Sequence, residues 1–243
     1  MAVSILGTNH ARRDAPCEDA IILTGHGEAV IAVVADGVGS ELAAKSGEGA
    51  RLAVQLASSA IARGLAAGLD ATQAVAEAFS HVHNTLVRRT EEEGAFWALY
   101  ACTLAAAVIE GTSITTGHIG DSCAFHFDGS RLTRVATAPV SEAPMIILHP
   151  GWRDDFTTQV VNKPYVKAYV LTSDGAGNFF LGRETDDARL TNPNITAMLL
   201  DHIRQNPDAF GVLAGFNALL QAKDYDSGDD RTMFWAIKKD AGP

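Results

Sequence analysis

Short runs of Val, Ile and Ala open the chain's hydrophobic pattern. They occupy residues 20–23 and 29–35, and the stretch Thr24-Gly25-His26-Gly27-Glu28 between them has the composition of a hairpin turn. We therefore predict an opening pair of antiparallel strands.

A different spacing follows. Residues 45–69 and 70–92 place their apolar side chains three or four positions apart, which is typical of amphipathic helices. Gly68-Leu69-Asp70 divides the two runs, and Asp70 is suited to cap the second one. The pattern predicts two neighbouring helices after the strand pair.

A second group of short apolar runs follows these helices. Tight-turn residues separate the runs, which cover residues 102–109, 113–119, 122–127 and 131–135. We predict one antiparallel meander over this stretch.

The last part of the chain is more varied. Residues 138–161 carry several prolines and read as a long loop, or flap, beside a functional site. Strands are predicted at 165–172 and 232–237, with helices at 195–204 and 207–222 between them.

Strand pairs joined by hairpins, with long helices between the groups, favour one fold class. We predict an α+β fold in which two packed antiparallel β-sheets form a β-sandwich flanked by α-helices on both sides. The chain of 243 residues shows no interdomain linker, so we expect a single domain over residues 1–243.

Charge and cysteine content narrow the class of protein. The net charge of −10 disfavours broad affinity for nucleic acid or an anionic membrane, and it fits the binding of cations. Three scattered cysteines indicate neither a disulfide framework nor a zinc site. With neither a signal peptide nor a membrane span recognisable, we expect a cytoplasmic protein.

Acidic residues follow four of the apolar runs, at the point where each run meets a turn. They lie in Ala35-Asp36-Gly37, Gly120-Asp121-Ser122, Ser173-Asp174-Gly175 and Gly228-Asp229-Asp230. Carboxylates that converge from several strand ends repel one another unless a cation compensates for their charge. This recurrence predicts a metal site.

Oxygen ligands without a Cys or His cluster favour Mg²⁺ or Mn²⁺ over zinc. The Gly37 carbonyl could serve as one such ligand, since glycine lets the backbone approach closely. Two such ions would suit hydrolysis of a phosphate ester, because they can activate a water and hold the phosphoryl group. The chemistry predicted from the residues is thus metal-assisted phosphoryl transfer to water.

These residues also resemble a known family. Their order is similar to that of the motifs in metal-dependent, type 2C serine/threonine protein phosphatases. The matching segments are Cys17-Glu18-Asp19-Ala20, Val34-Ala35-Asp36-Gly37-Val38-Gly39-Ser40, Gly49-Ala50, Thr103-Leu104-Ala105, Gly120-Asp121-Ser122, Thr172-Ser173-Asp174-Gly175 and Asp229-Asp230-Arg231-Thr232.

The resemblance implies a β-sandwich and a metal centre for phosphoserine and phosphothreonine proteins, opposing a serine/threonine kinase. A hydroxide bridging two Mn²⁺ or Mg²⁺ ions would attack phosphorus, and a third ion could bind more loosely. The implied metal ligands are Asp36, Gly37, Asp174 and Asp229, with Asp121 at the third ion. The implied catalytic residues are Glu18 and Asp19, which would orient metal-bound waters, and Arg13, which would hold the substrate phosphate.

The sequence departs from the family pattern in places. The family's phosphate-binding arginine is displaced here, so that Arg12 and Arg13 are both candidates. Val38 stands where many members have a histidine that protonates the leaving oxygen, and Cys123 replaces a common arginine. A catalytically silent binding or regulatory module and a phosphatase for small metabolite phosphates therefore remain alternatives.

Other sites are less well supported. Residues 37–42 lack the third glycine of a dinucleotide loop, and the chain has no Gly-Lys-Ser/Thr sequence of a P-loop. None of the eight histidines shows the i,i+4 spacing of metal ligands, so we expect each to lie on the surface or in a satisfied core.

Overall fold

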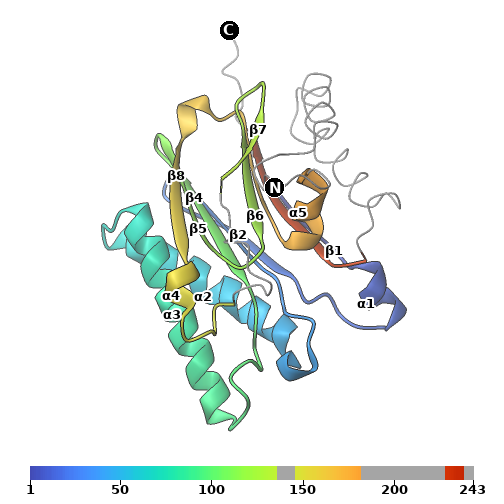
Figure 1. Ribbon diagram of the computed structural model, residues 1–243. Coiled ribbons are helices and arrows are strands. Elements are labelled where there is room, and N and C mark those ends of the chain that lie inside the picture. The colour runs from blue at the N-terminus through green and yellow to red at the C-terminus, as the bar shows by residue number, and fades with distance from the viewer. Residues whose placement is uncertain (136–145, 182–227, 238–243) are drawn as a thin grey trace.

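The computed structural model describes residues 1–135, 146–181 and 228–237. Two five-stranded antiparallel sheets pack face to face in this part of the chain (Figure 1). One sheet, in spatial order, consists of β1 (Ala2–Ile5), β10 (Arg231–Ile237), β9 (Ala168–Thr172), β6 (Cys123–Phe127) and β7 (Leu132–Arg134). The other consists of β2 (Ala20–His26), β3 (Ala29–Ala35), β4 (Leu104–Glu110), β5 (Ser113–Ile119) and β8 (Thr157–Asn162).

Helices cover the outer face of each sheet, as expected for the α+β sandwich. The longest are α2 (Ser46–Ala66) and α3 (Ala71–Glu92), which pack on the sheet that contains β2 to β5 and β8. Helix α5 (Asp174–Phe180) packs on the other sheet, which contains β1, β6, β7, β9 and β10. The remaining helical segments are α1 (Thr8–Arg12), η1 (Glu41–Ala43), α4 (Trp152–Asp155) and η2 (Lys163–Tyr165). The predicted fold class is confirmed.

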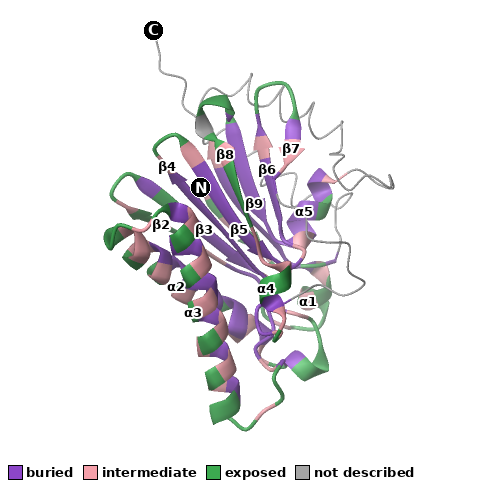
Figure 2. Cartoon of the chain, turned by 60° about the vertical axis from the view of Figure 1, so that its left-hand side comes forward, coloured by how far each residue is buried: buried purple, intermediate pink, exposed green. Residues whose placement is uncertain are grey.

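Strand β3 shows why its sequence is apolar throughout. Ile31, Val33 and Ala35 pack toward the helices, whereas Ala32 and Val34 face the second sheet. Because consecutive side chains of a strand point to opposite faces, a strand buried on both faces has no polar alternation. Figure 2 shows β3 and its neighbouring strands coloured as buried.

The two long helices occur where their apolar spacing predicts them. Asp70 caps α3: its side chain accepts a hydrogen bond from the backbone N–H of Gln73, and the side-chain oxygen of Gln73 accepts one from the backbone N–H of Asp70. The two bonds of this capping box satisfy backbone groups that the first helical turn leaves unpaired.

The predicted meander over residues 102–135 is wrong in one respect. Strands β4 and β5 lie in one sheet, but β6 and β7 lie in the other, so the chain crosses between the sheets at residues 120–122. Gly120 permits the crossing, because its φ of 102° is one that side chains disfavour. The crossing brings Asp121 to the end of the sandwich.

Residues 146–161, the described part of the loop predicted at 138–161, contain regular elements in place of that loop. These are α4 and then β8, which pairs with β5 from Ser113 to His118. Trp152 of α4 is buried against His83 and Phe156, so this segment is anchored in the helical layer. Most side chains of β8 are exposed, so the strand has no buried, apolar face that its sequence could have revealed.

Other boundaries differ from the expectations. Strand β2 continues to His26, so the opening turn is shorter than predicted, and β9 begins at Ala168 because η2 occupies residues 163–165. The apolar pattern did not predict β1, α1 or α5. The helices predicted at 195–204 and 207–222 lie outside the described residues, so the extent of the single domain stays a prediction.

Candidate active site

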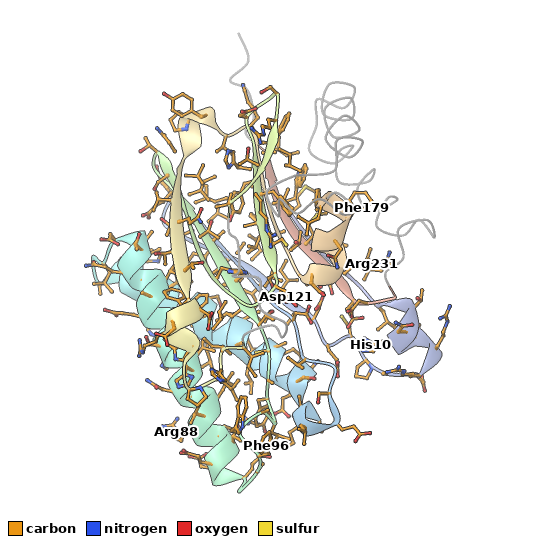
Figure 3. All side chains as sticks on the ribbon, viewed as in Figure 1. His10, Arg88, Phe96, Asp121, Phe179 and Arg231 are labelled. Carbon is orange, nitrogen blue, oxygen red and sulfur yellow. The ribbon has the colours of Figure 1, made fainter. Side chains whose placement is uncertain are left out.

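Aspartates from several segments of the chain lie at the same end of the sandwich. In antiparallel sheets the start of one strand lies beside the end of the next, so segments distant in sequence meet there. Paired positions such as Ala20–Ala35, Leu104–Ile119 and Thr172–Met233 bring the segments together. The aspartates next to these positions are Asp19, Asp36, Asp121, Asp174 and Asp229. Figure 3 labels Asp121 at this end of the sheets.

The electrostatics of Asp36 indicate that the carboxyl groups converge. Burial, followed by the charges of Asp19 and Asp174, holds the pKa of Asp36 well above its usual range. The charge of Asp121 acts in the same direction. Carboxylates this close repel one another, so the ionised form of Asp36 is disfavoured.

Asp19 and Asp121 experience similar effects. Burial raises the pKa of Asp19 to about 7, although hydrogen bonds from Ser173 and Thr232 counteract it. Burial and the charge of Asp174 raise the pKa of Asp121 to about 6. Both groups therefore keep a proton to higher pH than an ordinary aspartate does, and nearby positive charge would reverse this effect.

Asp174 links the cluster to β10. Burial and the charge of Asp174 together raise the pKa of Asp229. Gly175 makes this approach possible, because a Cβ at Gly175 would lie 2.1 Å from the carbonyl oxygen of Asp230. Asp36 and Asp229 thus both interact with Asp174, which lies at the first position of α5.

Within the described residues, three of these aspartates each have one buried oxygen without a hydrogen-bond partner: Oδ1 of Asp19, Oδ1 of Asp121 and Oδ1 of Asp174. Buried polar atoms without a partner are rare and costly. Oxygen atoms of this kind are the ligands that Mg²⁺ and Mn²⁺ prefer, so the donor set fits a hard divalent cation. Within the described residues, no three acidic, His or Cys side chains already surround a common point as metal ligands do.

Hydroxyl groups that the sequence did not single out hold these segments in place. Ser173 donates its hydroxyl to Asp19 at 2.7 Å and accepts the N–H of Thr232 at 3.0 Å. Thr103 accepts the N–H of Asp36 at 3.2 Å and lies 3.1 Å from the hydroxyl of Ser122. These contacts join positions far apart in sequence, so the only sequence signal for them is that all four hydroxyl residues belong to the motif segments that resemble the family.

The other predicted site residues have distinct positions. Gly37 has no room for a side chain, since a Cβ would lie 2.9 Å from the backbone of Ser46. Glu18 accepts the Ser46 hydroxyl at 3.1 Å near the start of α2. Arg12 and Arg13 are exposed at the end of α1, and no contact within the described residues ties the Arg13 guanidinium to the aspartates.

The sequence of residues 6–206 matches the family model described as Protein phosphatase 2C. The chain belongs to this family. No protein with a curated description matches it significantly.

Solved structures agree with the phosphatase 2C fold. Serine/threonine phosphatase Stp1 from Staphylococcus aureus has a TM-score of 0.71 at 13% identity, with 98% of this chain and 94% of that chain covered. The catalytic domain of serine/threonine protein phosphatase PstP, in complex with two manganese ions, has a TM-score of 0.68 at 19% identity, covering 98% and 96%. A bacterial serine phosphatase has a TM-score of 0.69 at 14% identity, covering 100% and 98%. At these identities the likeness establishes the fold.

One further property concerns the helices. Among the residues that the structure describes, no helix has the length and apolar character needed to span a membrane.

Proposed function

We propose that this phosphatase 2C family member is a metal-dependent serine/threonine protein phosphatase that hydrolyses phosphoserine and phosphothreonine esters with Mn²⁺ or Mg²⁺. The mutual repulsion of the carboxyl groups around Asp36 and Asp174 supports the proposal most directly. A cluster this acidic requires positive charge, and a divalent ion supplies more of it than a proton.

Asp36, Asp174 and Asp229 would hold two ions, with the Gly37 carbonyl as a further ligand and Asp121 at a third ion. When bound, the ions would lower the pKa of water to provide the nucleophile and would neutralise the phosphoryl oxygens. The structure of PstP with two manganese ions is consistent with this number.

The protein's own groups would prepare the reaction. Asp19 is fixed by the Ser173 hydroxyl, and Glu18 by Ser46, so both carboxylates are oriented toward their proposed role of accepting hydrogen bonds from water. Arg13, exposed at the end of α1, would hold the substrate phosphate, for which a guanidinium is well suited. A phosphoprotein substrate, opposition to a serine/threonine kinase and a cytoplasmic location follow from the family resemblance and stay predictions.

The proposal is tested with the metal-free protein and a phosphoserine peptide. Phosphate release should require added Mn²⁺ or Mg²⁺ and stop when the metal is chelated. A panel of sugar phosphates measured in parallel separates a protein phosphatase from a metabolite phosphatase. A protein that binds Mn²⁺ in calorimetry yet releases no phosphate from any substrate would instead be a catalytically silent module.

A further inference from the structure

His10 differs from the other histidines in its surroundings. Its Nδ1 lies 2.8 Å from Oδ2 of Asp230, the residue after the proposed metal ligand Asp229. Asp230 is buried and also accepts the backbone N–H groups of Gly7 at 2.7 Å and Glu18 at 2.6 Å. A carboxylate can only accept hydrogen bonds, so Nδ1 of His10 carries the hydrogen.

The backbone fixes His10 in this position. A Cβ at Gly7 would lie 2.3 Å from the carbonyl carbon of Asp229, so the chain before α1 touches the backbone before β10. The N–H of Asn9 donates to the carbonyl of Gly228 at 2.9 Å. Helix α1 is therefore attached to the same loop that carries Asp229.

The second ring nitrogen of His10 faces another proposed catalytic group. Nε2 lies 3.6 Å from Oε2 of Glu18, while Oε1 of Glu18 accepts the hydroxyl of Ser46. Burial alone would lower the pKa of His10, but the hydrogen bond from His10 to Asp230 and the nearby carboxylates outweigh it and raise the pKa. The ring lies between two carboxylates, and its protonated form attracts both.

We propose that His10 is a positioning residue of the phosphatase reaction: anchored on Asp230, it fixes the orientation of the Glu18 carboxylate. The inference rests on the proposed function, in which Glu18 orients the waters of the metal centre. Asp230 in turn couples that orientation to Asp229 through its own N–H, which donates to Oδ1 of Asp229 at 2.8 Å.

Two substitutions separate this role from a purely structural one. In His10→Asn the amide can reach Asp230 in place of Nδ1 but leaves nothing beside Glu18, whereas His10→Ala loses both contacts. We expect His10→Ala to lower the melting temperature and His10→Asn to restore most of it. In both variants kcat should fall by about 10- to 100-fold, as for other outer-shell partners of metal centres, while KM changes little.

The exposed His81 on α3 provides a matched control, since His81→Asn should alter neither quantity. If His10→Asn recovers kcat together with its melting temperature, the role is structural and the inference is overturned. A wild-type protein that releases no phosphate with Mn²⁺ would overturn the proposed function and the inference with it.

A double-mutant cycle of His10→Asn with Glu18→Gln tests the route of action. Should His10 act through Glu18, adding His10→Asn to Glu18→Gln lowers kcat no further. Losses that simply multiply would show that the two residues act independently and would overturn the inference.

Discussion

At the scale of single residues, Asp174 occupies the central place in the acidic cluster. Its charge acts on Asp36, Asp121 and Asp229, which come from three other segments of the chain. One of its oxygens is buried without a partner. Replacing this carboxylate should therefore affect both the binding of a metal and the repulsion within the protein.

We expect Asp174→Asn to lower phosphatase activity by more than about 100-fold, because the loss of a direct metal ligand should exceed the roughly 10- to 100-fold loss typical of an outer-shell partner. The metal-free variant should fold and melt no lower than the wild type, because an amide removes repulsion without changing the side-chain volume. Kinetic assays with a phosphopeptide and calorimetric unfolding in chelator measure the two effects. Activity close to that of the wild type would refute the placement of Asp174 at the centre.

Asp36 predicts a dependence on pH. Burial and neighbouring charges raise the pKa of Asp36 in the folded state. Its contribution to the stability of the metal-free protein is therefore fully present below the pKa that Asp36 has in the unfolded chain, and it is lost as pH rises toward the folded pKa. Asp36→Asn removes this penalty, and each pKa unit corresponds to about 1.4 kcal/mol. The variant's gain in melting temperature, measured in chelator, should be larger at pH 7.5 than at pH 5.

The pH dependence of the wild type alone would not isolate Asp36, because His118 also titrates and contributes with the opposite sign. Burial lowers the pKa of His118 to about 4, so its contribution to stability is lost as pH falls and opposes that of the carboxylates. Subtracting the wild-type curve cancels the effect of His118. An equal gain at both pH values would contradict the proposed repulsion at Asp36.

At the scale of elements, the site depends on how closely α5 approaches β10. Gly175 lies on the first turn of α5 against the backbone of Asp230, with no room for a methyl group. The same approach brings Asp174 and Asp229 together. The helix therefore contributes to the site through its position as well as its residues.

Gly175→Ala should push α5 away from β10, at a cost of about 1–3 kcal/mol, the range for overpacked positions. The affinity for Mn²⁺ should weaken as Asp174 and Asp229 separate. Gly25→Ala in β2 is the matched control, because its Cβ would meet only ordinary contact, at 3.6 Å, and it should leave metal affinity unchanged. Chemical unfolding and titration calorimetry measure both variants, and equal Mn²⁺ affinity in the two would count against the predicted displacement.

At the scale of the whole molecule, the proposed centre joins the two sheets. Asp36 follows β3 of one sheet, whereas Asp174 and Asp229 flank β9 and β10 of the other. A metal held by both would cross-link the sandwich at one end. Binding should therefore stabilise the folded chain as a unit.

We expect Mn²⁺ at about 100 times its dissociation constant to stabilise the protein by about 2.7 kcal/mol. For a chain of this size that corresponds to a rise of roughly 5–10 °C in melting temperature, which differential scanning calorimetry can follow. Asp174→Asn should show little of this rise. A shift as large in that variant as in the wild type would place the Mn²⁺ site elsewhere.

Local sequence determined much of the fold. The apolar runs and helical spacing correctly predicted most strands, both long helices and the Asp70 cap, because these features depend on residues near one another in the chain. The Asp motifs, through their order along the chain, likewise indicated the family to which the protein belongs.

Tertiary structure decided the rest, because the deciding contacts join residues far apart in sequence. No local pattern shows that the chain changes sheets at Gly120 or that the short helix α1 places His10 on Asp230. His10 reads as an ordinary surface or core histidine in the sequence, and only the approach of Glu18 and Asp230 in space gives it a distinct role. The types of side chain at the site could thus be predicted from the sequence, whereas their mutual electrostatics arose from the packing of the two sheets.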